Sequence, residues 1–203
     1  LQHRSATRPI APEAITVLQS LSNSDNRAQA LRAIWTLHVT QNLEATRLMR
    51  MVTHPDELIR AWAIQLGTER SGEALLPTDT LAQLAKDDPS PVVRLALASA
   101  MPQLAADASW TIGTALAGHS EDASDRFLPK MIWCGIGRLA PDNLPRALAL
   151  ANATPLTSLT DSIRWFASRT QQGRELLLGS LAEQDAAKTS QALRIMAFAM
   201  KDD

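Results

Sequence analysis

The stretch of sequence that decides the fold reads Asp88-Pro89-Ser90-Pro91-Val92-Val93-Arg94-Leu95-Ala96-Leu97-Ala98-Ser99-Ala100-Met101. From Val93 to Leu104 its apolar residues follow the spacing i, i+3, i+4, i+7, i+8 and i+11. This is the period of one buried face of an α-helix. The prolines precede that face, where the first helical turn tolerates a residue without an N–H group. The stretch therefore predicts a helix that begins close to Pro91.

The same pattern recurs along the chain, each time with a basic residue near the start of the apolar run. Six such residues lie 28 to 36 positions apart, namely Arg32, Arg60, Arg94, Lys130, Arg164 and Arg194. Second apolar stripes lie between them, and no strand alternation competes with the helical period. A repeat of this length fits one helical hairpin per unit. We therefore expect an all-α fold, a right-handed α-α superhelix (solenoid) of about five to six antiparallel helix pairs, as a single domain over residues 1–203.

Composition narrows the function classes. The chain is 45% hydrophobic and 20% charged, with a net charge of −1, so it lacks the basic excess of a nucleic-acid binder. Residues 71–140 carry five basic and eight acidic side chains, which we interpret as a solvated rim of loops. No run approaches the ~20 apolar residues that span a bilayer, so we expect no direct membrane insertion. The sequence begins without methionine and without a signal peptide, and we expect it to be a fragment of a longer multidomain protein.

Tryptophan and cysteine are interpreted as packing residues. Tryptophan follows the basic residue of a repeat by one to three positions in four repeats, which predicts core packing between helices for Trp35, Trp62, Trp133 and Trp165. Trp110 lies outside this register, and we expect it to be partly exposed. The single cysteine, Cys134, lies in an apolar run, which predicts a small buried filler.

Candidate chemical sites are few. His119 with Glu121, Asp122 and Asp125 is the densest cluster of metal-ligand residue types, but it lacks the glycine and spacing of a calcium loop. We interpret it as an exposed loop between helices, with Glu121 and Asp122 solvated. No dinucleotide-binding, phosphate-binding or serine-elbow motif occurs. We therefore predict no catalytic, cofactor-binding or metal-binding residue, no cofactor, and no enzymatic activity.

The turn before each basic residue carries a family resemblance. The pattern Asp-Pro-x-x-Val-Arg-x-x-Ala, present at 88–96 with one residue inserted, resembles the HEAT repeat, and residues 54–63 look like a second copy. The resemblance implies that the turn aspartate and the following arginine bond across neighbouring repeats, whereas Lys130 departs from this pattern. It also implies the structural repeat positions Asp56, Arg60, Trp62, Asp88, Arg94, Trp133 and Arg164.

A narrower resemblance covers roughly residues 24–170. Residues 30–38, 59–64, 88–100 and above all 119–136 are similar to the HEAT segment of large bacterial membrane-bound dehydrogenases. In those proteins a sugar-dehydrogenase-like β-propeller precedes the HEAT region, and a haem-binding cytochrome c domain with a CxxCH motif follows it. The resemblance implies an exported, periplasmic setting. This sequence contains neither partner domain, so no catalytic residue is carried over.

These observations favour a non-catalytic scaffold that mediates protein-protein or interdomain interaction, with a protein partner or the sister domains of the parent chain. Unpaired faces of the end repeats predict weak self-association. Two alternatives stay open. A HEAT-like DNA glycosylase would need a basic groove, which the net charge disfavours, and salt-dependent DNA binding would test it. A chromophore-lyase-like HEAT protein would copurify with pigment.

Overall fold

The computed structural model describes residues 10–69, 74–181 and 186–199. In these residues the chain is all-helical, with two short 3-10 helices and no strand. The 3-10 helices are η1 (Met101–Gln103) and η2 (Ser120–Asp122). The α-helices are α2 (Pro12–Leu21), α3 (Arg27–Val39), α4 (Ala45–Met51), α5 (Glu57–Thr68), α6 (Thr78–Asp87), α7 (Pro91–Ala100), α8 (Ala106–Leu116), α9 (Leu128–Gly137), α10 (Leu144–Ala153), α11 (Thr157–Ser168), α12 (Gln171–Leu181) and α13 (Ala186–Ala199).

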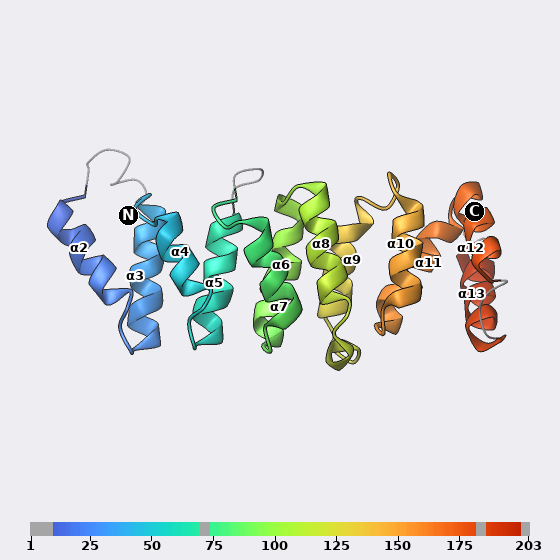
Figure 1. Cartoon of the computed structure of the whole chain (residues 1–203), viewed down its shortest axis with the longest axis horizontal. Coiled ribbons are helices and arrows are strands. Elements are labelled where there is room, and N and C mark those ends of the chain that lie inside the picture. The colour runs from blue at the N-terminus through green and yellow to red at the C-terminus, as the bar shows by residue number, and fades with distance from the viewer. Residues whose placement is uncertain (1–9, 70–73, 182–185, 200–203) are drawn as a thin grey trace. The chain divides into compact units, whose positions relative to one another are not determined.

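Consecutive α-helices pack as pairs: α2 with α3, α4 with α5, α6 with α7, α8 with α9, α10 with α11, and α12 with α13 (Figure 1). The predicted fold class is confirmed, because the described residues form an all-α, solenoid-like helical repeat. The chain divides into two compact units, residues 1–77 and 78–203. The single domain predicted over residues 1–203 stays a prediction.

The unit 1–77 contains the first two pairs. The side chains of Asn26 and Asp56 cap the N-termini of α3 and α5 by accepting backbone N–H groups, which fixes where these helices begin. Helix α3 also packs on α5, the second helix of the next pair. The core between these helices is apolar and closed to solvent, and includes Ile34, Leu48 and Ile64.

The unit 78–203 contains the other four pairs. Its second helices α7, α9, α11 and α13 pack each against the next, and α6 packs on α8 (Figure 1). The apolar stripe predicted from 93 to 104 lies in this core, with Val93, Leu97 and Met101 each at most 1% exposed. Leu128, Ile132 and Ile136 continue the same core on α9. Neighbour-to-neighbour burial therefore positions the second helices.

Gly135 allows one close approach between helices. A Cβ atom built on Gly135 would lie 2.5 Å from Cε and 2.7 Å from Cβ of Met101. A side chain at this position would therefore displace the methionine that closes the core of the preceding pair. This close helix contact offsets the roughly 1 kcal/mol that glycine costs in a helix.

Two predictions about individual side chains are wrong. Trp110, expected to be partly exposed, is only 3% exposed, and the guanidinium of Arg146 lies 4.9 Å from its ring centroid. Cys134, expected to be buried, is exposed. It lies two residues from both Ile132 and Ile136, roughly 200° around the helix from each, so it faces away from the core.

Candidate interaction surface

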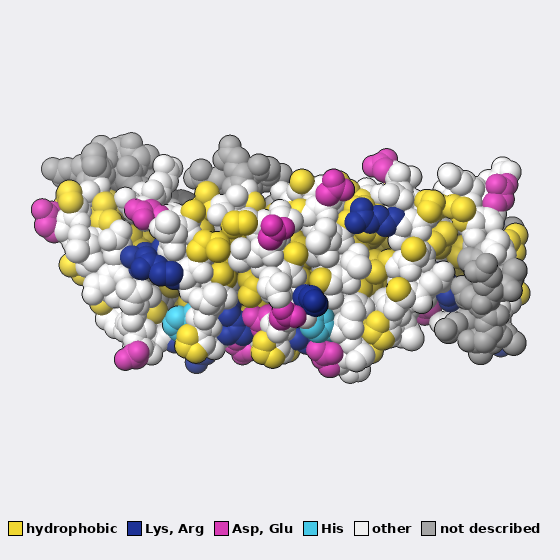
Figure 2. Space-filling model, in the orientation of Figure 1, with side chains coloured by type: hydrophobic (Ala, Val, Ile, Leu, Met, Phe, Trp, Pro, Cys, Tyr) yellow, Lys and Arg dark blue, Asp and Glu magenta, His cyan; other side chains and the backbone are white. Residues whose placement is uncertain are grey.

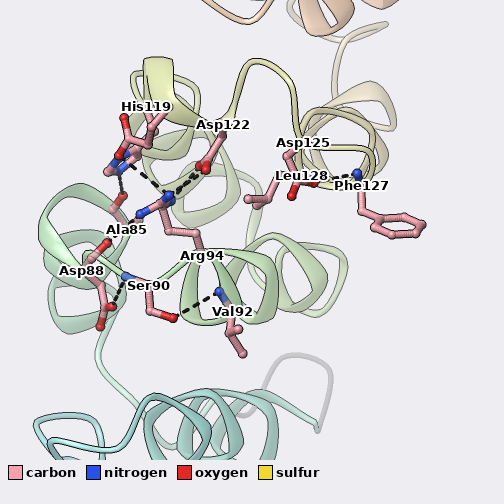
Figure 3. A network of polar contacts seen from close by, with 11 residues as sticks. Ala85, Asp88, Ser90, Val92, Arg94, His119, Asp122, Asp125, Phe127 and Leu128 are labelled. Carbon is pink, nitrogen blue, oxygen red and sulfur yellow. Dashed lines mark hydrogen bonds and ion pairs between the residues drawn. The ribbon is translucent and has the colours of Figure 1, made fainter.

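A buried arginine joins two neighbouring helix pairs. Nε and Nη2 of Arg94, on α7, donate to Oδ2 and Oδ1 of Asp122 at 2.6 Å each (Figure 3). Nη1 of the same guanidinium donates to the backbone oxygen of Asp88 at 3.0 Å. The Arg94 and Asp122 side chains are 2% and 5% exposed. Hydrogen bonding to the Asp122 carboxylate raises the pKa of Arg94, so the guanidinium stays charged in this buried place.

Local turn chemistry holds this arginine in place. The carboxylate of Asp88 accepts the N–H of Ser90, and the hydroxyl of Ser90 accepts the N–H of Val92 (Figure 3). Pro91 then supplies the first turn of α7, where no N–H is required. Asp88 and Ser90 are both buried. The sequence Asp-Pro-Ser-Pro thus starts α7 in the register that directs Arg94 toward the next pair.

The acidic segment 119–125 belongs to the same contact between helix pairs. Nε2 of His119 lies 2.9 Å from the backbone oxygen of Ala85 on α6, and Nδ1 lies 2.8 Å from a carboxylate oxygen of Glu121. Asp125 accepts the N–H groups of Phe127 and Leu128 at the start of α9, and these bonds lower the pKa of Asp125 (Figure 3). The hydrogen bond of a backbone N–H and that of His119 lower the pKa of Glu121.

The expectation of a fully solvated segment 119–125 is therefore wrong for Asp122, which is buried against Arg94. Glu121 and Asp125 are exposed, as expected. In the part of the chain that the structure describes, no group of three or more histidine, cysteine, aspartate and glutamate side chains could hold a metal ion. The carboxylate of Asp122 is instead paired with the guanidinium of Arg94. Other polar groups of the segment hydrogen-bond to the backbone of α6 and of the start of α9.

The other predicted repeat positions make related contacts. Nη1 of Arg60 donates to the backbone oxygens of His54 and Pro55, as Arg94 does to that of Asp88. Asp56 accepts the N–H of Leu58, and a carboxylate oxygen of Asp56 lies 3.5 Å from Arg27. Arg164 is buried and donates to the side chain of Asn152 at 3.4 Å. Asp56 and Arg60 lie at the start of α5, whereas Arg164 lies within α11.

Sequence reasoning missed Arg138, which makes a further contact of this kind. Its Nη2 donates to the backbone oxygens of Met101 and Leu104 and to the hydroxyl of Ser109, each 3.1 or 3.2 Å away. The signal was available, because a basic residue at the last turn of a helix can reach carbonyl groups at the end of a neighbouring helix. Arg138 thereby bonds α9 to the turn between α7 and α8.

The tryptophans predicted to be core residues lie partly on the surface instead. Trp35 and Trp165 are 37% and 40% exposed, so the prediction is wrong for these two, and Trp62 and Trp133 are half-buried. Two pairs of neighbouring second helices, α3 with α5 and α9 with α11, still bring aromatic rings together. Trp35 and Trp62 meet edge to face with centroids 4.9 Å apart, and Trp133 meets Phe166 in the same way at 5.6 Å. The rings combine packing with an accessible apolar surface.

A groove of about 460 Å³ adjoins the second aromatic pair. It is lined by Trp133 of α9 and by Thr157, Ser158, Asp161, Ser162 and Trp165 of α11. Aromatic, hydroxyl and carboxylate groups therefore meet on one accessible surface. This combination can bind a ligand by stacking and hydrogen bonding, and it lacks the opposed acid and base of a hydrolytic site.

Two further observations describe the surface. Basic and acidic side chains are interspersed on the face shown in Figure 2. Over residues 10–69, 74–181 and 186–199, the helices are too short or too polar for any of them to cross a bilayer.

Comparisons with known proteins do not extend this description. No family model, no curated protein and no solved structure matches the chain.

Proposed function

We propose that the chain is a non-catalytic helical-repeat scaffold, which binds a protein partner or a sister domain through the exposed sides of its second helices. The observation that carries this proposal is the recurrence of accessible aromatic rings there. Trp35 meets Trp62 in one unit, and Trp133 meets Phe166 beside Trp165 in the other. Partly exposed tryptophans are enriched at protein interfaces, because they supply a large contact area with little conformational freedom to lose.

The polar residues support a structural rather than a chemical role. Arg94 and Asp122, which are almost closed to solvent, bond one helix pair to the next together with His119. A catalytic cluster would direct such groups into a cleft with a substrate-sized opening. Here the guanidinium is satisfied by Asp122 and by a backbone oxygen.

We further propose that this scaffold is a HEAT segment of an exported dehydrogenase that also carries a propeller and a cytochrome c domain. The support is the similarity over roughly residues 24–170, strongest at 119–136. The proposal predicts that the partner surface belongs to one of those two domains. Reading the coding sequence on both sides of this chain tests it, because a CxxCH motif downstream is expected.

Cys134 offers a direct test of the interaction surface, because it is exposed on α9 beside Trp133. We would label it with a maleimide photo-crosslinker, illuminate the labelled chain in an extract of its source cells, and identify adducts by mass spectrometry. Discrete adducts that excess unlabelled chain removes are expected, with a propeller or cytochrome peptide among them.

The matched control moves the label to a first helix. In the variant Cys134→Ser with Thr111→Cys, the thiol sits on α8 at an exposed position. This variant is expected to give few adducts. Equal adduct patterns from the two positions would show that the second helices are not a preferred binding surface.

The predicted self-association is retained as a proposal. Leu193 and Phe198 on α13 are 46% and 65% exposed, which supports it. Sedimentation at high concentration would contradict it if the chain stays strictly monomeric.

A further inference from the structure

The groove beside Trp133 is a shallow, open depression whose lining residues come mainly from α11. Thr157, Ser158, Asp161, Ser162 and Trp165 follow the spacing i, i+1, i+4, i+5 and i+8, so they form one side of this helix. Trp133 comes from α9, which packs against α11. Ile132 and Ile163 are both fully buried, so the helices that carry the lining residues are anchored in the core.

A third helix fixes the carboxylate in this groove. Nε2 of Gln191, on α13, donates to Oδ1 of Asp161 at 2.8 Å. The amide orients the carboxylate without carrying a charge of its own. Over residues 10–69, 74–181 and 186–199, Oδ2 makes no hydrogen bond, so it can accept one from a guest. Asp161 is the one charged residue among the groove's lining residues. Charge complementarity therefore selects a cationic guest.

The indole rings favour the same charge. A guanidinium or ammonium group over an indole face is attracted by the ring quadrupole. This chain uses that contact internally, since guanidinium carbons lie 4.9 Å from the Trp110 centroid and 5.6 Å from the Trp165 centroid. The second of these belongs to Arg169, which covers Trp165. Trp133 packs edge to face with Phe166 and lines the groove with the rest of its ring, which is the surface offered to a guest.

The hydroxyl groups of the groove favour an arginine side chain over a lysine side chain as the guest. Thr157 and Ser158 lie one turn before Asp161 and supply acceptor oxygens along the groove. A guanidinium presents five N–H donors in a plane and stacks on aromatic rings, whereas an ammonium is a compact, strongly hydrated charge. The volume of the groove, about 460 Å³, exceeds that of one side chain.

We propose that the groove formed by Trp133, Asp161 and Trp165 binds an arginine side chain of a protein partner. The inference rests on the proposed scaffold function and names the partner chemistry at one place. The guanidinium lies against Trp133 and donates to Asp161, while Arg169 of the chain itself lies over Trp165.

The test is a titration of the full chain with the capped peptide acetyl-Gly-Arg-Gly-amide, followed by the indole N–H resonances of Trp133 and Trp165. These resonances are assigned with Trp133→Phe and Trp165→Phe. A single anchored side chain is expected to bind with Kd on the order of 1 mM. The same peptide with citrulline in place of arginine is expected to bind about tenfold more weakly, because its urea group is uncharged.

Variants separate the groove from the rest of the surface. Asp161→Asn is expected to weaken the arginine peptide about tenfold, whereas Asp107→Asn, at a fully exposed carboxylate on α8, leaves it unchanged. Arg169→Gln is expected to tighten binding, because it removes a competing cation. The assignment would be overturned if the citrulline peptide bound equally well or if the indole resonances did not shift. It would also be overturned if a sugar that can stack on indole rings, maltotriose, shifted these resonances and the arginine peptide did not. Adducts at Cys134 without peptide binding would reject this inference and leave the scaffold function standing.

Discussion

The guanidinium of Arg94 lies edge-on to the carboxylate of Asp122, with both nitrogen–oxygen distances at 2.6 Å. Twenty-eight residues separate the two, so the bond joins the α6/α7 pair to the turn that leads into α9. Both side chains are almost closed to solvent. A buried ion pair of this kind adds little stability over an apolar pair, but removing one partner leaves a charge without compensation. The joint is therefore sensitive to single substitutions.

Arg94→Ala is expected to lower the free energy of unfolding by about 3–5 kcal/mol, because it leaves the carboxylate of Asp122 buried and unpaired. The free energy of unfolding of Arg94→Lys is expected to lie between those of Arg94→Ala and the original chain, since an ammonium cannot make the two parallel bonds. Urea denaturation followed by circular dichroism measures both.

Two further variants control this experiment. Arg32→Ala removes an exposed arginine, and its free energy of unfolding is expected to stay within about 0.5 kcal/mol of that of the original chain. The double variant Arg94→Met with Asp122→Leu is expected to recover most of the loss, because no uncompensated charge remains. A loss for Arg94→Ala no greater than that for Arg32→Ala would mean that the pair is not a structural joint.

The sequence was sufficient for the helices but not for this joint. Periodicity predicted the stripe from Val93 to Leu104 because burial alone dictates it. The resemblance named Asp88 and Arg94 as positions that bond across neighbouring repeats, but it did not name Asp122 as the residue that Arg94 reaches. Within its own turn, Asp88 accepts the N–H of Ser90 with its side chain and Nη1 of Arg94 with its backbone oxygen. Asp122 was missed because two adjacent acidic residues in a loop are typical of solvated turns. Asp122 lies 28 residues after Arg94 in the sequence, which is one repeat period, and this spacing could have indicated the pair.

The side-chain environments of the tryptophans could not be read from register alone. Trp35 and Trp165 were predicted as core residues from their position after the basic residue of the repeat. A position at the boundary between core and solvent carries the same spacing as a core position, and both side chains are exposed. Trp110 lies on a first helix, where Ile112 and Leu116 define the buried side together with it. Its burial depends on a helix far along the chain, because Arg146 of α10 covers the ring.

Trp110→Ala is expected to lower the free energy of unfolding by about 3–5 kcal/mol, since it deletes a large side chain that is 3% exposed. Trp165→Ala is its matched control, because that indole is 40% exposed, and a loss of less than about 1.5 kcal/mol is expected. Chemical denaturation compares the two. Equal losses would contradict the assignment of Trp110 to the core and Trp165 to the surface.

Gly135→Ala is expected to destabilise the chain by about 1–3 kcal/mol, although alanine is the better helix former. The added methyl group would lie 2.5 and 2.7 Å from Cε and Cβ of Met101, and the second of these atoms is fixed to the backbone. Thermal and urea unfolding measure the change.

Gly179→Ala is the control for that substitution. It places the same methyl group in helix α12 where no atom lies within 4 Å, so only the helix propensity changes. This variant is expected to stabilise the chain by about 0.4–1 kcal/mol. Opposite signs for the two glycines are the critical outcome, and a stabilising Gly135→Ala would show that Met101 moves aside freely.

Asp125→Ala tests how the start of α9 depends on pH. The N–H groups of Leu128 and Phe127 hold the pKa of Asp125 below its usual value, so its contribution is present above the unfolded pKa of about 3.9 and is lost as pH falls through the folded value. At pH 7 the variant is expected to lose about 0.5–2 kcal/mol of stability, as other lost helix caps do. Below about pH 4 that difference should shrink, because the protonated carboxyl accepts the two bonds poorly.

Asp107→Ala is the control, because it removes a fully exposed carboxylate, and it should change the stability little at either pH. Unfolding curves at both pH values decide the matter, and a difference for Asp125→Ala that persists undiminished at pH 2.5 would rule out an ionised cap.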